Sequence, residues 1–406
     1  MTLYRGTFVD CPDDPFAGGA LRTLDGALLV EDGVIVARGS RAELAGLPGE
    51  EQEVDLAGGL VVPGFVDTHV HYPQVRVIGG LGMPLLEWLD ACALPEEQRL
   101  AEPGYARAIA REFLGSLARA GTTTALVFGA HYAAAMDEFF AEADASGLRI
   151  ASGMVVSDRY LPAPLLTTPE RALAESLDLA SRWHGRGRLR YAVTPRFSYS
   201  CSDDLLAACG EAVAAIDGAL FTSHVNENRA EIAQVEADFG CSYVDTYARR
   251  GLLSPRAVLA HDVHPTDAEL ATLAASGAAV AHCPCSNSAI GSGMFPFGRH
   301  LDHGVRVALG SDVGGGVSFS LLREGLQAAF VQQLLGAEGR ALGPAHLLWL
   351  ATRAGASALG LDDVGTFCVG RRFDAAWLRP AAGSTLDIGL RHARDADDAV
   401  AKCFAL

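Results

Sequence analysis

Apolar and polar positions alternate at two different periods along this chain. From about Leu60, short apolar runs with the composition of buried strands are separated by Ala- and Leu-rich segments of helical period. The predicted strands are residues 60–66, 123–129, 149–155, 189–195, 219–224, 256–260, 278–282 and 305–310. The predicted helices are residues 104–120, 133–146, 169–184, 203–216 and 264–275. Repeated alternation of strand and helix indicates parallel strands joined by crossover helices.

This alternation predicts an α/β fold, and its extent favours one architecture. Eight strand–helix units over roughly 300 residues are typical of a (β/α)₈ TIM barrel. An open, doubly wound sheet is the alternative. It is disfavoured because no G-x-G-x-x-G follows the first predicted strand.

Both ends of the chain show short β-like runs instead. Residues 27–30 and 34–37 flank an Asp-Gly pair, which is a hairpin signal. Residues 366–369 and 375–378 are two further short β-like runs. We predict that the two ends pair into a small β-sandwich domain beside the barrel. The predicted boundaries are 1–60 and 363–406 for the small domain and 61–362 for the catalytic barrel.

Charge and composition exclude several classes of protein. The 406 residues carry 32 Lys and Arg against 49 Asp and Glu, a formal net charge of −17, and half of them are hydrophobic. This composition excludes a disordered chain and argues against a nucleic-acid or anionic-membrane surface. Lys402 is the single lysine of the sequence. A P-loop and a Schiff-base lysine in the body of the fold are therefore excluded.

Cysteine usage and targeting signals indicate the compartment. The nine cysteines are an odd number, and no pair of C-x-x-C motifs is present. The first 20 residues lack a basic start followed by an apolar run, and no apolar run of about 18 residues suggests a membrane span. We expect a cytoplasmic protein with reduced thiols and no membrane partner.

Histidines at the ends of predicted strands are the strongest chemical signal. Residues two apart in a strand point to the same side, so His69 and His71 can bind one metal ion from the mouth of the first strand. His224, His261 and Asp312 end or follow three further strands, at the edge where a parallel barrel builds its site. Imidazole and carboxylate ligands suit zinc, with iron as the alternative. Six other histidines are expected at the surface or at helix ends: His131, His184, His300, His303, His346 and His392.

Glu227 is the predicted acid/base. It stands three residues after His224, so that a metal ligand and a proton carrier come from one strand-to-helix turn. Other hydrolase signatures are absent, since the sequence contains no H-E-x-x-H, no G-x-S-x-G and no P-C-x-x-C.

Six segments resemble the amidohydrolase superfamily, and within it the guanine deaminase family. In chain order they are Pro63–His71, Pro84–Leu89, Thr194–Cys201, Ser223–Asn228, Ala281–Pro284 and Gly310–Gly316. The resemblance runs in order from about residue 60 to 335. It implies a TIM barrel with a small β domain from both termini. It also implies a cytoplasmic homodimer that hydrolyses guanine to xanthine and ammonia in purine catabolism.

The resemblance implies roles for the residues already singled out. His69, His71, His224 and Asp312 would hold one Zn²⁺. Binuclear members of the superfamily bridge two metals with a carboxylated lysine on a barrel strand, and Lys402 cannot take that place. His261 would orient the attacking water or bind the metal directly, Asp312 would accept a proton, and Glu227 would protonate the ring.

Recognition of the base would fall to three further residues. Arg196 suits a ring carbonyl, Gln74 suits ring nitrogens because it both donates and accepts, and Phe197 suits the ring face. Packing in the core is the alternative for Phe197. The metal-site side chains His71, His224, Glu227 and Asp312 would also touch the substrate.

Other functions share part of this pattern. Deamination of another ring, such as 8-oxoguanine, a pterin or a triazine, would use the same metal motif. Ring-opening amide hydrolysis is disfavoured because a barrel lysine is missing. A non-catalytic scaffold is disfavoured because every expected ligand and Glu227 are present.

Overall fold

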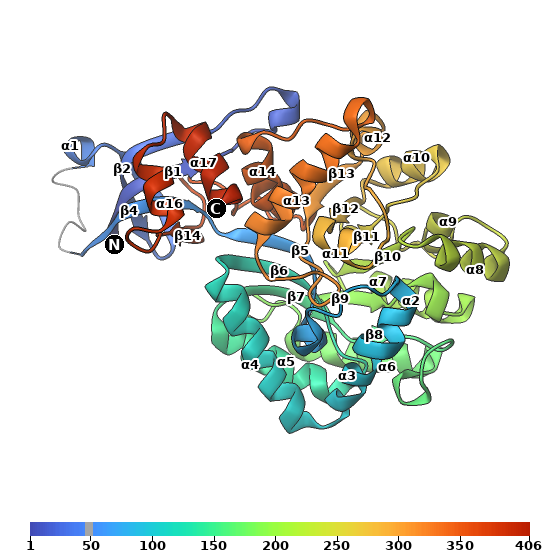
Figure 1. Ribbon diagram of the computed structural model, residues 1–406. Helices are drawn as coiled ribbons and strands as arrows, with labels where there is room; N and C mark the ends of the chain where they lie inside the picture. The colour runs from blue at the N-terminus through green and yellow to red at the C-terminus, as the bar shows by residue number, and fades with distance from the viewer. Residues whose placement is uncertain (45–51) are drawn as a thin grey trace.

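Eight parallel strands form a barrel in the larger part of the molecule, with the small sheet beside it (Figure 1). The computed structural model describes residues 1–44 and 52–406. The barrel strands neighbour one another in chain order and are β5 (Phe65–His71), β6 (Thr122–Phe128), β7 (Arg149–Gly153), β9 (Arg190–Pro195), β10 (Leu220–Val225), β11 (Ala257–His261), β12 (Ala279–His282) and β13 (Arg306–Leu309). A short strand, β8 (Val155–Val156), also pairs with β9.

Hydrogen bonds between the first and last barrel strands close the ring. The hydroxyl of Thr68 donates to the carbonyl of Leu309 at 2.8 Å. Just beyond β13, the amide of Asp312 donates to the carbonyl of His69 at 2.8 Å, and the amide of His71 donates to Val313 at 2.9 Å. The predicted TIM barrel is therefore confirmed, and the open sheet is excluded.

The predicted helices lie on the outside of the barrel. They are α4 (Pro103–Arg119), α5 (Ala133–Ser146), α6 (Pro169–Trp183), α7 (Asp203–Ala215) and α10 (Asp267–Ser276). The remaining helices are α1 (Arg41–Leu44), α2 (Leu85–Trp88), α3 (Leu94–Gln98), α8 (Arg229–Phe239), α9 (Tyr243–Ala248), α11 (Pro284–Ala289), α12 (Phe297–Asp302), α13 (Leu321–Leu334), α14 (Pro344–Ala351), α15 (Arg353–Ala358), α16 (Thr385–Arg391) and α17 (Ala396–Ala405). The apolar stripe of α4 buries Ile109, Phe113 and Leu117 against the strands, as the helical period requires.

A second, five-stranded sheet joins the two ends of the chain. Its order is β14 (Ala375–Leu378), β4 (Glu53–Pro63), β1 (Thr2–Asp10), β2 (Arg22–Glu31) and β3 (Val34–Gly39). Asp32 and Gly33 both have positive φ in the β2–β3 turn, as the Asp-Gly hairpin signal requires. The small sheet domain is confirmed. The predicted domain boundaries remain a prediction.

The small domain differs from the expected sandwich in two ways. Its described strands form one sheet, and the C-terminal segment adds the helices α16 and α17 (Figure 1). Helix α17 forms because its apolar face packs on the barrel, where Phe404 lies against the bare backbone of Gly325 in α13. The predicted strand 366–369 is wrong, because the amide of Phe367 donates to the side chain of Asp10 at 2.7 Å instead of to a strand.

The predicted strand 60–66 is also wrong in its extent. Strand β4 ends at Pro63 and β5 begins at Phe65, so this apolar run leaves the small sheet and enters the barrel. Gly64 makes the transition, since a Cβ at this position would lie only 2.1 Å from the hydroxyl of Thr123. Periodicity could not show this change, because both strands are apolar there.

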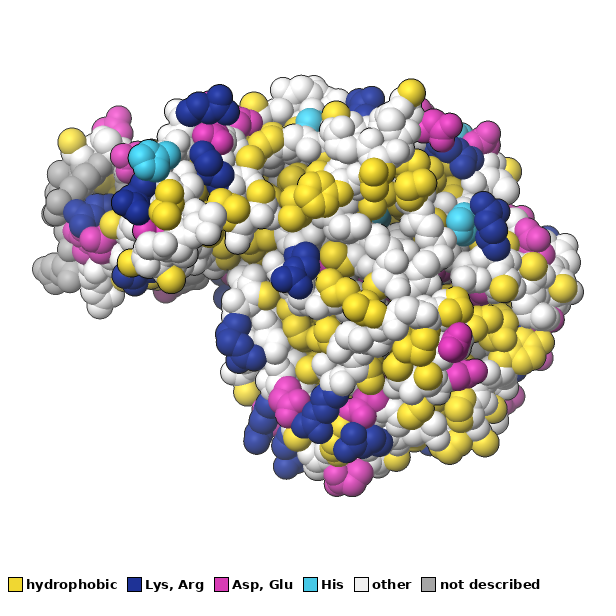
Figure 2. Space-filling view, viewed as in Figure 1, with side chains coloured by type: hydrophobic (Ala, Val, Ile, Leu, Met, Phe, Trp, Pro, Cys, Tyr) yellow, Lys and Arg dark blue, Asp and Glu magenta, His cyan; other side chains and the backbone are white. Residues whose placement is uncertain are grey.

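The surface carries charges of both signs. Figure 2 shows positive and negative side chains intermixed over the part of the viewed face where α4 and α5 lie. Arg107 and Arg111 of α4 form ion pairs with Glu138 and Glu142 of α5. Within residues 1–44 and 52–406, no helix has both the length and the apolar content needed to cross a membrane.

Candidate active site and metal centre

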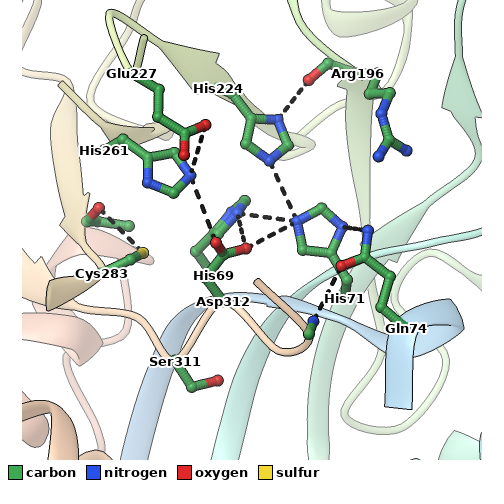
Figure 3. Close-up of polar contacts among 12 residues, drawn as sticks. His69, His71, Gln74, Arg196, His224, Glu227, His261, Cys283, Ser311 and Asp312 are labelled. Atoms are coloured by element: carbon green, nitrogen blue, oxygen red, sulfur yellow. Dashed lines mark hydrogen bonds and ion pairs between the residues drawn. The ribbon is translucent and has the colours of Figure 1, made fainter. Parts of the chain in front are cut away.

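The five predicted metal-site residues converge at the C-terminal mouth of the barrel (Figure 3). His69 and His71 lie on β5, His224 on β10 and His261 at the end of β11, and Asp312 follows β13 by three residues. All five side chains are buried. Parallel strands bring these positions together, because their carboxyl ends meet at one rim.

The ligand atoms face one another at close range. Nε2 of His71 lies 3.1 Å from Nε2 of His69 and 3.2 Å from Nε2 of His224. Oδ1 of Asp312 lies 3.1 Å from Nε2 of both His69 and His71. A tetrahedral zinc ion with Zn–N distances near 2.05 Å would place its ligand atoms about 3.3 Å apart. The observed separations match this spacing.

Hydrogen bonds on the far side of two rings indicate which nitrogen is free. Nδ1 of His224 lies 2.6 Å from the carbonyl oxygen of Arg196, which can only accept, so Nδ1 donates and Nε2 presents a lone pair. Nδ1 of His261 likewise lies 2.9 Å from Oδ1 of Asn287, while its buried Nε2 has no hydrogen-bond partner. A ring anchored at Nδ1, with Nε2 turned into the cluster, is the arrangement of metal-binding histidines. The residues therefore fit a metal ion.

His261 is an additional candidate ligand. One ligand atom each from His69, His224, His261 and Asp312 lies within 4.8 Å of the others. Nε2 of His261 is 3.7 Å from Oδ2 of Asp312 and 3.5 Å from Oε2 of Glu227. It therefore lies between the metal cluster and the predicted acid/base, where it can reach either a metal ion or a water molecule beside it.

Burial sets the charge state of the cluster. It lowers the pKa of His69 to about 3, against the opposing effect of Asp312, and holds the pKa of His224 well below its usual value. Burial raises the pKa of Asp312, but hydrogen bonds from His69 and His71 outweigh it and the net pKa lies well below the usual range. Neutral imidazoles beside an ionised carboxylate are the ligand forms that a divalent cation requires.

Glu227 lies in the turn between β10 and α8, with its side chain buried beside His261. Burial, together with the charge of Asp312, raises its pKa to about 8, while a hydrogen bond from Ser292 opposes the rise. The hydroxyl of Ser292 donates to Oε1 of Glu227 at 2.9 Å. A carboxyl group with a pKa near the working pH can both give and take a proton.

The backbone is strained at these strand ends. Asn226, His261, Asp262 and Asp312 have φ values of 48°, 75°, 45° and 47°, in the left-handed region that non-glycine residues rarely adopt. All four positions are a site residue or the direct neighbour of Glu227 or His261. Strain of this kind gathers at functional sites, where the surrounding structure holds it in place.

The predicted recognition residues line the same pocket. Its walls include Gln74, Arg196 and Phe197, together with His71, His224, Glu227, His261 and Asp312. Apolar side chains from the segment after β5 and from the end of α11 cover it, namely Leu85, Trp88, Leu89 and Ile290. Phe197 packs with these apolar side chains, so it belongs both to a local core and to the pocket wall.

The structure also shows polar residues at the site that sequence reasoning missed. Glu97 of α3 accepts hydrogen bonds from Gln74 and Arg196. Asp67 accepts from the backbone and hydroxyl of Ser311 at 3.0 and 2.5 Å, which ties the turn before Asp312 to β5. The position of Asp67 two residues before His69, within the segment Pro63–His71, is the signal that could have identified Asp67. Glu97 had no comparable signal.

Two of the six histidines expected at the surface or at helix ends are buried instead of exposed. The side chain of His131 is buried, with Nε2 3.3 Å from Oε2 of Glu97. His300 is also buried, with Nε2 2.9 Å from Oδ2 of Asp262. Both ring positions follow from burial of a partner carboxylate, which a linear sequence does not show.

Comparisons with known proteins agree with this architecture. The family model described as the amidohydrolase family matches residues 60–392. A protein of Deinococcus radiodurans described as a probable guanine deaminase is 60% identical over 100% of this chain and 95% of its own length. The solved structure of E. coli guanine deaminase matches with a TM-score of 0.96 and 34% identity, covering 100% of this chain and 95% of that one.

A further solved structure bears on the pocket. A guanine deaminase from C. acetobutylicum, described as having guanine bound in the active site, matches with a TM-score of 0.86 and 27% identity. The match covers 92% of this chain and 90% of that one. The family model spans most of the sequence, and the relatives match it from end to end. The chain therefore belongs to the amidohydrolase family, among the guanine deaminases.

Proposed function

We propose that this chain hydrolyses guanine to xanthine and ammonia, with one Zn²⁺ ion held at the mouth of the barrel. The observation that carries this proposal is a single buried pocket with three parts: a His/Asp cluster, the carboxyl group of Glu227, and the paired Arg196 and Gln74. The relatives named as guanine deaminases support the choice of substrate.

His69, His71, His224 and Asp312 would hold the ion, with His261 beside them. The ring nitrogens and the carboxylate oxygen that these side chains turn toward one another support that assignment. When bound, a zinc ion lowers the pKa of a water molecule from 15.7 toward about 7, which supplies a nucleophile at neutral pH. Lys402 lies on α17 in the small domain, so no barrel lysine is available to bridge a second ion.

Glu227 moves the protons of the reaction. The oxygen of water bonds to C2 of guanine, Asp312 accepts one proton of the water, and Glu227 protonates N3, which makes C2 tetrahedral. The proton on Asp312 then passes to the amine at C2 with the help of Glu227, which takes up the second proton of the water as the bond between C2 and that nitrogen breaks. Water and guanine thus yield xanthine and ammonia. The position of Glu227 beside His261, at 3.5 Å, supports this role.

Arg196, Gln74 and Phe197 orient the base. The guanidinium of Arg196 donates to the carbonyl at C6, and the amide of Gln74 pairs with ring nitrogens. Phe197 packs on the ring, next to Leu85 and Trp88. His71, His224, Glu227 and Asp312 close the opposite side of the pocket, where C2 lies.

We also propose that the enzyme acts in the cytoplasm as a homodimer, in the catabolism of purines. All nine cysteines are free thiols, which suits a reducing compartment. The dimer rests on the family resemblance.

Turnover by the purified, zinc-loaded chain tests the proposal. Ammonia release is measured with guanine, 8-oxoguanine, adenine, cytosine and a pterin. We expect guanine to be strongly preferred, xanthine to form in equal amount, and chelation to abolish the reaction. Faster release from another ring would keep the metal chemistry and overturn the substrate. No release from any ring, with zinc bound, would overturn the function.

A further inference from the structure

Glu97 is a buried carboxylate that the mechanism above leaves unused. It lies on α3, in the segment that covers the pocket between β5 and α4, and its side chain is only 2% exposed. Burying a lone carboxylate is costly, so a residue of this kind needs partners. Its partners include the two recognition residues Gln74 and Arg196.

Three side chains converge on Glu97. Nε2 of Gln74 donates to Oε1 at 2.8 Å, and Nη1 of Arg196 donates to Oε2 at 2.6 Å. Nε2 of His131 lies 3.3 Å from Oε2. Both carboxylate oxygens are thus used, and each one holds a different recognition residue.

These contacts fix what the recognition residues can offer. Oε1 of Gln74 accepts from the amide of Gly314 at 3.0 Å, so the two ends of the amide group are held by Glu97 and by the turn after Asp312. Arg196 has five N–H donors and gives one of them to Glu97, which leaves the others free for a ring carbonyl. Glu97 therefore sets the direction of both side chains.

Glu97 also sets the charge at this edge of the pocket. Burial raises its pKa, but the charge of Arg196, the nearby ring of His131 and the hydrogen bond from Gln74 outweigh burial, and the net pKa lies below the usual value. Burial lowers the pKa of His131, so this ring adds no charge at neutral pH. The positive charge of Arg196 is thus balanced before any ligand arrives.

We propose that Glu97 is a positioning residue that aligns Gln74 and Arg196 and makes this edge select neutral purines over anionic ones. The inference rests on the proposed function and adds a specificity determinant to it. An uncompensated Arg196 would attract any anionic ring that fits the pocket. The Arg196–Glu97 pair offers directed donors without net charge, which suits a neutral base such as guanine.

The test is Glu97→Gln, which keeps the shape of the side chain and removes its charge. We expect kcat/KM for guanine to fall about tenfold or more, mostly through KM, with metal content unchanged. Inhibition constants are also measured for urate, an anion at neutral pH, and for hypoxanthine, which is neutral. We expect urate binding to gain roughly tenfold relative to hypoxanthine, because one charge now acts at close range in a buried site.

Two further variants separate positioning from folding. Glu96→Gln is the matched control, because Glu96 is the neighbouring buried carboxylate but pairs with Arg99 at 2.8 Å, away from the pocket. We expect its kinetics and its urate preference to match those of the unmodified chain. Adding Glu97→Gln to Arg196→Met should lower kcat/KM for guanine much less than Glu97→Gln does alone, because Arg196, the main partner of Glu97, is already absent.

The outcomes distinguish this inference from the proposed function. An unmodified chain that does not deaminate guanine would overturn both. An active unmodified chain with unchanged guanine kinetics and an unchanged urate preference in Glu97→Gln would overturn only the role of Glu97. Equal losses in Glu96→Gln and Glu97→Gln would also overturn it, because they would reveal a general effect on the covering segment.

Discussion

The two ends of the pocket differ in how their polar atoms are paired. At the metal end, ring nitrogens of His69, His71 and His224 face one another, and the buried Nε2 of His261 has no partner. At the recognition end, Glu97 accepts one hydrogen bond from Gln74 and one from Arg196. The metal end therefore offers its ligand atoms to a cation, whereas the recognition end is organised before any ligand binds.

The two ends also come from different parts of the chain. The candidate metal ligands lie on barrel strands or within three residues of a strand end. The recognition end combines Arg196, which follows β9, with residues of the covering segment such as Glu97 and Trp88. The barrel thus supplies the chemistry, and the segment between β5 and α4 adjusts what the chemistry acts on.

Among these variants, Glu227→Gln should lower activity the most. It should impair the chemistry at the metal end without affecting the recognition end. The amide has the same shape and can still accept from Ser292, but it cannot carry a proton. We expect kcat to fall by about 10²–10⁴-fold with bound zinc unchanged, measured by ammonia release and metal analysis.

Glu231→Gln is the control for the buried charge near Glu227. Glu231 is also buried, but its partner is Tyr243 and it belongs to the first turn of α8. Its kcat should stay close to that of the unmodified chain. If Glu227→Gln kept activity within a few-fold, the proton would have to travel through another group, with His261 the nearest.

Arg196→Met should have the next largest effect and confine it to the recognition end. It removes the donors to the ring and leaves Glu97 buried with an unpaired charge. We expect kcat/KM for guanine to fall about 100-fold while the affinity for zinc is retained. Arg196→Lys should restore the ion pair with Glu97 but little of kcat/KM for guanine, because a lysine lacks the planar fork of donors. Equal loss of zinc and guanine binding in Arg196→Met would show that the two ends are not separable.

Much of the fold followed from periodicity, and the failures have local causes. Strands such as β6 and β12 were predicted to within a residue or two. In an α/β chain, a short apolar run between two helical segments indicates a buried strand. The helices after β13 were not predicted. These helices pack against neighbours on more than one side. In α14, for example, the buried residues do not form the single apolar stripe from which an amphipathic helix is predicted.

The candidate ligands were found because strand ends converge in a barrel, whatever the loops between them do. Glu97 was not found because it stands beside Glu96 in a polar stretch. Both carboxylates are buried, and only their partners in the fold distinguish them. The positive φ values of His261 and Asp312 are likewise a tertiary property. The sequence pattern therefore predicts residues that the barrel brings together at its strand ends. It misses residues whose role depends on a single buried contact, such as Glu97.

The smallest expected effect concerns how firmly Glu227 is held. One neutral hydroxyl, that of Ser292, donates to Oε1 of Glu227 at 2.9 Å, whereas Gln74 and Arg196 are held by a charged group. Ser292→Ala should lower kcat about fivefold, in line with the loss of about 1 kcal/mol of hydrogen bonding, and leave KM and zinc content unchanged.

Ser288→Ala is a suitable control, since Ser288 donates to the carbonyl of Pro284 at 2.8 Å within α11 and does not line the pocket. A larger loss in Ser292→Ala than in Glu97→Gln would reverse the comparison between the two ends. Glu227 would then depend more on its hydrogen bond from Ser292 than Gln74 and Arg196 depend on Glu97. An unchanged kcat in Ser292→Ala would instead show that burial against His261 is enough to hold Glu227 in place.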